Sequence, residues 1–173
     1  MILEFGDMWT VWNRSDLFLI TTNACVRPDG RLVMGAGIAK QARDRWHGRL
    51  DLRLGALLTE RAKHKTEFLR RSTIYTMLEP EYNLLVSPQW PSASLGLFQV
   101  KRHFHMDASI GIIQRSTDAL AAWCAEHPKA EVHLNFPGIG NGRLSRDAVM
   151  PIIKKLPDSV HVWQFEEEAD ATI

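Results

Sequence analysis

Two glycine-rich segments are the strongest candidates for chemistry in this sequence. They are Met34-Gly35-Ala36-Gly37-Ile38 and Pro137-Gly138-Ile139-Gly140-Asn141-Gly142. Glycine lets the backbone approach a ligand closely and adopt positive φ, and successive backbone N–H groups beside a helix N-terminus form a cradle for an anion. One such loop alone is more often a tight turn. Two in one chain suit a diphosphate that bridges two sugars.

A short basic segment, Lys101-Arg102-His103, supplies further side chains that could react. A lysine becomes a nucleophile only when desolvation or a neighbouring cation lowers its pKa, and Arg102 and His103 could have that effect. Such a cluster is more often solvated. His103 and His105 alternate, so in a strand they would share one face and could bind a metal. We identify no third ligand, and we expect no metal and no cofactor.

Several other classes of site are disfavoured by the same spacing arguments. The first loop is similar to a dinucleotide fingerprint, but Lys40 stands where its third glycine should be, and no early strand–loop–helix unit precedes it. No Gly-Lys-Ser/Thr follows either loop, which argues against hydrolysis of nucleoside triphosphates. Cys25 and Cys124 show neither zinc-ligand spacing nor the pattern of a disulfide framework.

Length and charge favour one soluble domain. The chain has 173 residues, with 21 Lys and Arg against 20 Asp and Glu, so any anion site must be local. No segment reads as a signal peptide or membrane span, and we expect a cytoplasmic monomer.

Lys63-His64-Lys65 and Arg70-Arg71 could touch a nucleic-acid backbone but more often form solvated surface. Trp9, Trp12 and Trp90 could stack on a base; core packing is the safer expectation for them and for Trp46, Trp123 and Trp163.

Alternating strands and helices predict an α/β fold that positions these loops. The run over residues 17–22 is apolar and β-branched throughout, which is typical of a strand buried on both faces. Residues 25–34 and 88–96 read as loops. We expect helices over residues 37–46 and 50–62, one capped by Asp107 and ended by Pro128, and one capped by Ser145 and running to Leu156. The expected strands cover residues 1–5, 17–22, 72–78, 83–86, 97–100, 131–136 and 160–165.

Four segments resemble motifs of the macrodomain family, in the family's order, over residues 2 to about 163. They are Gly6-Asp7-Met8; Thr22-Asn23-Ala24 followed by Val33-Met34-Gly35-Ala36-Gly37-Ile38-Ala39; Phe98-Gln99-Val100-Lys101-Arg102-His103; and Pro137-Gly138-Ile139-Gly140-Asn141-Gly142-Arg143-Leu144. The resemblance is to the branch that holds DarG, an antitoxin that removes ADP-ribose from DNA, and the terminal ADP-ribose protein glycohydrolase. It implies a three-layer fold with a mixed, largely parallel central sheet flanked by helices. We expect a single macrodomain over residues 1–166 and an acidic tail over residues 167–173.

The resemblance also implies a ligand, ADP-ribose, and a role for each matching residue. Asp7 would accept a hydrogen bond from the adenine amino group, and Asn23 would bind the distal ribose. Lys101 would act as a nucleophile on the anomeric carbon, with Asn23 beside it. The ADP-ribose-binding set is then Asp7, Met8, Asn23, Met34, Gly35, Ala36, Gly37, Ile38, Pro137, Gly138, Ile139, Gly140, Asn141, Gly142, Arg143 and Leu144.

Departures from the family pattern leave three functions open. Gly142 stands where the terminal protein glycohydrolase has a catalytic aspartate, while Gln99-Val100 replaces Pro-Thr and Ile139 replaces a cysteine. The first function is an ADP-ribosyl glycohydrolase that acts on modified DNA, at a guanine or thymine base, or on protein. The second is a reader that binds ADP-ribose without turnover. The third is an ADP-ribose 1″-phosphate phosphatase, for which only His103 or His105 could activate water.

Overall fold

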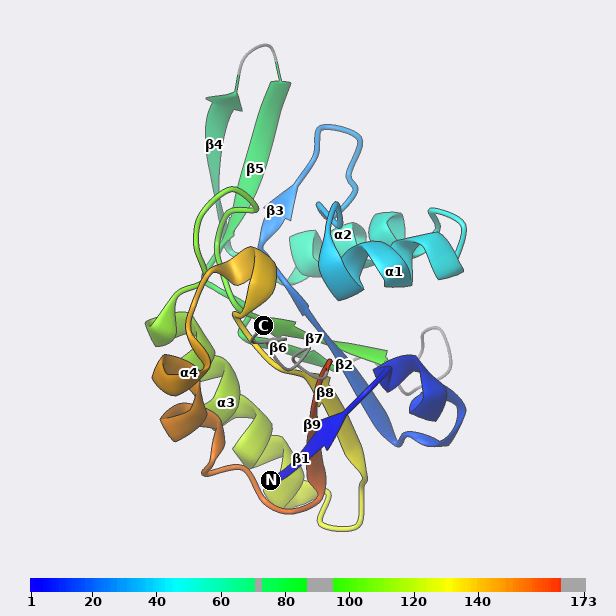
Figure 1. Ribbon diagram of the computed structural model, residues 1–173. Coiled ribbons are helices and arrows are strands. Elements are labelled where there is room, and N and C mark those ends of the chain that lie inside the picture. Colours follow the sequence, from blue (N-terminus) through cyan, green and yellow to red (C-terminus); the bar gives the residue numbers. More distant parts are fainter. Residues whose placement is uncertain (71–72, 87–94, 166–173) are drawn as a thin grey trace, which may run out of the picture.

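The apolar segments of the chain assemble into a six-stranded sheet in the computed structural model, which describes residues 1–70, 73–86 and 95–165 (Figure 1). The strand order is β1-β9-β8-β2-β7-β6. Neighbouring strands run parallel except β6 and β7, which are antiparallel. The expected mixed, largely parallel sheet is therefore confirmed. The strands are β1 (Ile2–Phe5), β2 (Leu17–Thr22), β6 (Leu84–Val86), β7 (Leu95–Gln99), β8 (Val132–Asn135) and β9 (Val160–Gln164).

Helices cover both faces of this sheet, which gives the three layers. Figure 1 shows α1 (Gly37–Arg45) and α2 (Leu50–Arg61) on one side, and α3 (Ile110–Glu126) and α4 (Arg146–Ile153) on the other. Successive residues of β2 point to opposite faces. Phe18 and Ile20 join the core beneath α1 and α2, whereas Leu17 and Leu19 join the core beneath α3 and α4. A strand buried on both faces needs the continuous apolar run that the sequence has.

The helix caps match one expectation and correct another. Ser145 caps α4, because its Oγ accepts a hydrogen bond from Ala148 N at 3.2 Å. Ser109, and not Asp107, caps α3, with Oγ 3.4 Å from Ile112 N. Asp107 instead forms an ion pair with Arg143 at 3.0 Å. The expected end of the fourth helix at Leu156 is wrong as well, since α4 ends at Ile153 and residues 154–156 form a turn and a bend.

A second sheet lies beside the first and departs most from expectation. Its order is β3-β5-β4, with β3 (Cys25–Val26), β4 (His64–Arg70) and β5 (Thr73–Glu79) all antiparallel. Residues 25–34 were expected to be a loop, but β3 and a bridge between Val26 and Leu32 lie within them. β4 runs through the segments expected to be charged surface. Figure 1 shows the β4–β5 hairpin extending past the ends of the main sheet.

Three tryptophans of the first half pack together beneath α1, as expected. A 3-10 helix, η1 (Met8–Arg14), which the sequence did not indicate, carries Trp9 and Trp12. The Trp9 ring lies 4.8 Å from Phe18, and Trp12 lies 5.2 Å from Trp46. Trp163 also packs against this core. Trp90, the segment expected as a loop over residues 88–94 and the acidic tail lie outside the described residues.

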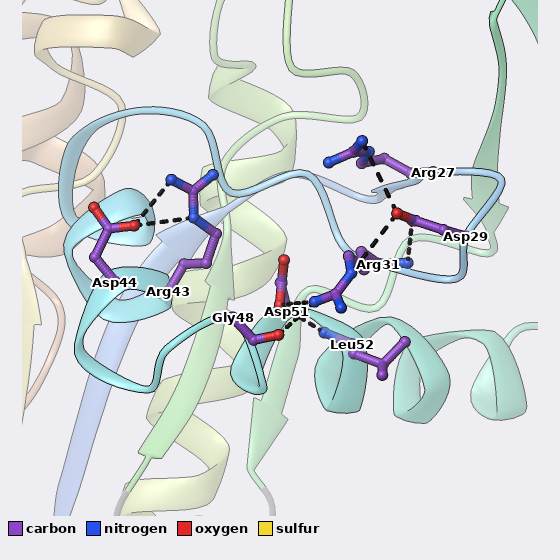
Figure 2. A network of polar contacts seen from close by, with 8 residues as sticks. All are labelled: Arg27, Asp29, Arg31, Arg43, Asp44, Gly48, Asp51 and Leu52. Atoms are coloured by element: carbon purple, nitrogen blue, oxygen red, sulfur yellow. Dashed lines mark hydrogen bonds and ion pairs between the residues drawn. The ribbon is translucent and has the colours of Figure 1, made fainter.

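The loop that leads into the first glycine segment is fixed by α2. Asp51, which is buried, accepts a hydrogen bond from Arg31 Nη1 at 2.9 Å and from Leu52 N at 3.0 Å (Figure 2). Arg31 also donates to the carbonyl of Gly48. Leu32 N donates to Asp51 O at 2.9 Å. These bonds hold residues 31–32 against the start of α2, two residues before Met34.

A closer contact occurs at Gly55, in the middle of α2. A Cβ built on Gly55 would lie 2.0 Å from Gly30 O and 2.8 Å from Leu32 N, and both are backbone atoms. Gly55→Ala should therefore push the loop away from α2, at a cost of about 3 kcal/mol in the free energy of unfolding. Urea unfolding followed by circular dichroism would measure the loss.

Gly111 in α3 is the matched control for this change. Its added Cβ would meet only the end of the Arg115 side chain at 3.5 Å and Ser109 Oγ at 3.8 Å. Alanine is a better helix former than glycine by up to about 1 kcal/mol, so Gly111→Ala should leave stability unchanged or raise it. Equal stability of the two variants would contradict the packing argument.

Candidate functional site

A cleft of about 390 Å³ opens where β2, β7 and β8 end. Parallel strands bring their carboxyl ends to one edge, where ligands bind in α/β proteins. Thr22 lies opposite Gln99 in the β2–β7 register. Beyond the strands, Val100 N donates to Thr22 O at 3.0 Å and Ala24 N donates to Arg102 O at 3.1 Å. The exits of β2 and β7 are thus bonded together on both sides of Asn23 and Lys101.

The first glycine loop forms one wall of the cleft. Gly35, Ala36, Gly37 and Ile38 all line it, and Gly37 begins α1. Gly37 has a φ of +55°, which favours glycine. The first turn of α1, from Gly37 to Ala39, lines the cleft, and no side chain caps the helix, so its first backbone N–H groups and the positive end of its dipole are available there. This wall can cradle an anion.

The second glycine loop forms the opposite wall. Gly138 has a φ of +80° and packs against α3, where an added Cβ would lie 2.6 Å from Ile113 Cδ1. Ile139, Asn141, Gly142 and Arg143 line the cleft together with Gly138. Gly140–Gly142 form a 3-10 turn, η2. The two expected loops therefore face each other across one cleft.

Lys101 joins the second loop to the turn that follows β7. Its Nζ donates hydrogen bonds to Asn141 O and Met106 O, each at 3.0 Å. Burial lowers the pKa of Lys101 below the ordinary value for lysine; nearby Arg143 lowers it further and Asp107 opposes the change. Lys101 lines the cleft. Its side chain thus lies in the cleft, and its pKa is shifted in the direction that favours a free amine.

Asn23 lines the same cleft but already has structural hydrogen bonds. Its Nδ2 donates to Val33 O at 2.8 Å, and its Oδ1 accepts from Cys25 N at 2.9 Å. Both bonds tie the β2 exit to the segment that leads into the first glycine loop. A carboxamide has a second N–H and a second lone pair, so Asn23 can still bond to a sugar hydroxyl. Burial raises the pKa of the neighbouring Cys25 thiol to about 12, which disfavours thiolate chemistry there.

Asp7 lies in a separate hollow beside the main cleft. Its Oδ1 accepts a hydrogen bond from Trp9 N at 3.0 Å, so it caps η1. The hollow is lined by Asp7, Trp9, Gln41, Asp44, Arg45 and Phe165. Because α1 contributes residues to both this hollow and the main cleft, the two lie along the same helix.

Five other residues expected to bind do not line the main cleft. Met8 and Met34 are core residues with 4% and 2% of their surface exposed. Pro137 and Leu144 flank the second loop, and Leu144 packs against the core. The fifth, Gly140, has a φ of +61° and allows the turn of the second loop.

The structure adds three cleft residues that the sequence reasoning missed, which are Thr21, Phe104 and Asn135, and it places Thr22 and His105 in the same cleft. Asn135 ends β8 as Asn23 follows β2, and its Oδ1 accepts from Thr21 N at 3.0 Å. That shared pattern, an asparagine at the end of a buried strand, is a signal that could have identified it. Phe104 had no comparable signal.

His103 and His105 lie in the turn that follows β7. Residues 102–106 form turns and bends, and the two rings lie 5.6 Å apart and nearly parallel, at 29°. His103 is 8% exposed and stacks on Phe104 at 4.5 Å. Within the described ranges, no group of three or more His, Cys, Asp or Glu side chains could hold a metal ion.

The position of Gly142 has no room for an aspartate, the residue that the terminal protein glycohydrolase has there. An added Cβ would lie 2.9 Å from Ala108 Cβ, and Ala108 N donates to Gly142 O at 2.8 Å. Asp107 is an acidic residue that acts on Lys101, because its charge raises the pKa of that lysine. The second loop therefore offers backbone groups to a ligand and no side-chain acid at this position.

Comparison with known proteins gives a clear fold. No protein-family model matches the sequence, and no curated protein shows significant sequence similarity to it. The macrodomain of Thermus aquaticus DarG superposes with a TM-score of 0.57 at 16% identity, over 96% of this chain and 97% of that one. The macrodomain of Mycobacterium tuberculosis DarG gives 0.55 at 18% identity, over 95% and 99% of the two chains.

A third solved structure is Thermosipho africanus DarTG in complex with ADP-ribose. It superposes with a TM-score of 0.60 at 16% identity, over 94% of this chain and 41% of that one. The fold of this protein is that of a macrodomain. Its solved neighbours include the DarG macrodomains, as the motifs indicated. Within the described residues, no helix is both long enough and apolar enough to cross a membrane.

Proposed function

We propose that this protein binds ADP-ribose, with the diphosphate held between the two glycine loops. The observation that carries the proposal is the pairing of two backbone walls across one cleft, one of them the uncapped N-terminus of α1. The chain has a net charge of +1, so local N–H groups and Arg143 must supply the attraction. The ADP-ribose in the Thermosipho africanus DarTG structure supports the same ligand.

The hollow that contains Asp7 suits the adenine end. Asp7 Oδ1 bonds to Trp9 N, and the second carboxylate oxygen would accept a hydrogen bond from the adenine amino group. Phe165 is 70% exposed, and its ring offers a face on which a base can stack. With adenine there and the diphosphate between the loops, the distal ribose lies toward Asn23 and Lys101.

We further propose that the protein is an ADP-ribosyl glycohydrolase in which Lys101 is the nucleophile. Lys101 must first lose a proton, because its ammonium donates to two carbonyl groups. The free amine would bond to the anomeric carbon as the bond to the leaving group breaks, and water would then displace the amine. Over the cycle one water is consumed: its hydroxyl stays on the ribose and its proton ends on the leaving group. The leaving group would be a guanine or thymine base of DNA, or a protein side chain.

A reader function without turnover is the second candidate, and one observation favours it. Gly142 leaves no space for an acid, and the Lys101 ammonium already bridges two loops as a structural donor. A lysine that remains protonated in the complex would bind and not react. The charge of Asp107 raises the pKa of Lys101 and so favours the protonated form.

Two measurements on the unmodified protein distinguish these candidates. Calorimetric titration with ADP-ribose should show saturable binding, with ADP and ribose 5-phosphate as weaker controls, and absence of ADP-ribose binding would refute the whole proposal. Incubation with ADP-ribosylated DNA and with carboxylate-linked ADP-ribosylated protein should release free ADP-ribose from one of them. Binding without release from either substrate would establish the reader.

A further inference from the structure

Gln99 has a polar side chain at a fully buried position of β7, where an apolar side chain is the usual choice. It ends β7 and is 0% exposed, among the buried residues Leu95, Leu97 and Phe98 of the same strand. Burying an amide costs free energy unless its groups are hydrogen-bonded. The bonds that Gln99 makes therefore show what this residue does.

The Gln99 side chain connects two segments. Its Oε1 accepts from Asn83 N at 3.0 Å, and its Nε2 donates to Lys101 O at 3.2 Å. The main chain of Gln99 is held too, because its N donates to Asn83 O at 2.8 Å and its O accepts from Ser116 Oγ at 2.8 Å. Gln99 thus fixes the carbonyl of Lys101 relative to the segment before β6.

Tyr82, next to Asn83, holds the exit of β2 in the same way. Its hydroxyl donates to Asn23 O at 3.1 Å and contacts Thr22 Oγ1. Burial raises the pKa of Tyr82, so this hydroxyl stays neutral and remains a donor. Residues 82–83 therefore reach both Asn23 and, through Gln99, Lys101.

We infer that Tyr82, Asn83 and Gln99 form a bracket that positions Asn23 and Lys101 relative to each other. The inference rests on the proposed function, in which these two residues meet the distal ribose. The three bracket residues are positioning residues, because none of them lines the cleft. Gln99 also occupies the place of a proline in the resembling motif, and proline has no amide to make these bonds.

The test uses two variants that each remove one side of the bracket. Gln99→Met keeps the length of the side chain but removes both amide bonds, and Tyr82→Phe removes one hydroxyl. Misplacement of a reacting group by about 1 Å costs about 10²-fold in rate. We expect each variant to lower kcat by about 10- to 100-fold with little change in KM.

A second readout does not depend on turnover. The titration of the Lys101 ammonium, followed by NMR on lysine-labelled protein and assigned with Lys101→Arg, should shift toward the ordinary lysine pKa. The reason is that a displaced side chain loses the burial that lowers its pKa. If the parent protein binds ADP-ribose without hydrolysing it, weaker binding replaces the loss of kcat as the expected result.

Ser15→Ala is the matched control for loss of a buried hydrogen bond. Ser15 Oγ donates to Val11 O at 2.7 Å at the carboxyl end of η1, and Ser15 does not line the cleft. A Ser15→Ala protein should keep the parent kcat and the parent Lys101 titration. The bracket is wrong if either test variant keeps both parent values, or if Ser15→Ala loses as much. A parent protein that fails to bind ADP-ribose refutes the proposed function, while the Lys101 titration still tests the bracket.

Discussion

Lys101→Met should lower the rate of ADP-ribose release by about 10³-fold or more, the scale expected when a nucleophile is removed. The physical reason is that the lysine amine is the group proposed to attack the anomeric carbon. Release of ADP-ribose from the better of the two modified substrates, measured under single-turnover conditions, gives the rate. Methionine also removes the two hydrogen bonds to Asn141 and Met106, so a loss in this variant alone has two explanations.

Lys101→Arg separates these explanations. Arginine keeps the positive charge and can still donate to both carbonyls, but it stays protonated and cannot act as a nucleophile. We expect Lys101→Arg to bind ADP-ribose with a Kd near that of the parent and to be as inactive as Lys101→Met. Substantial turnover by the arginine variant would mean that Lys101 is a structural donor and that another group reacts.

The pH dependence gives a sharper check on the same residue. Activity should rise with pH as the ammonium loses its proton, with an apparent pKa below the ordinary lysine value of about 10.4. The cation of Arg143 disfavours the ammonium, so Arg143→Gln should move the profile to higher pH. Asp107 favours the ammonium, so Asp107→Asn should move it to lower pH. Shifts of the same sign in both variants would exclude Lys101 as the titrating group.

The central layer of this fold could be predicted because its sequence pattern is local. A run such as residues 17–22 must be buried on both faces, and the glycine loops follow from residue type alone. The β4–β5 hairpin was different. Its first strand reads His-Lys-Thr-Glu-Phe-Leu-Arg, in which polar and apolar residues do not alternate. Such a strand forms because it pairs with β5 along seven residues, and a pairing partner is not visible in the strand itself.

The site was predictable in parts for a similar reason. Motif order placed Asn23 and Lys101 in one site, and the structure puts them in one cleft at the ends of adjacent strands. The motifs could not show which side chains are exposed to the cleft and which are buried in the core. Met8 and Met34 fall inside matched segments, yet their side chains are buried in the core. The role of Gln99 depends on a bond to Asn83, 16 residues away, which a departure from a motif cannot reveal.

Gly35→Glu should weaken ADP-ribose binding by about 100-fold or more. A Cβ on Gly35 would have no atom within 4 Å, so a new side chain leaves the backbone without a clash at a residue that lines the cleft. A carboxylate there would repel the diphosphate and occupy its space, and each tenfold loss in affinity requires only about 1.4 kcal/mol. Calorimetry with ADP-ribose would measure the change.

The choice of Gly35 and of its control makes this the cleanest test of the ligand site. Glutamate at Gly37 or Gly140 would also strain the backbone, because these residues have φ of +55° and +61°. Gly111→Glu places the same charge in the first turn of α3, where acidic residues favour a helix and no cavity wall is altered. That variant should bind ADP-ribose as the parent does. If Gly35→Glu binds equally well, the diphosphate does not lie between the two glycine loops, and the orientation proposed for the whole ligand is wrong.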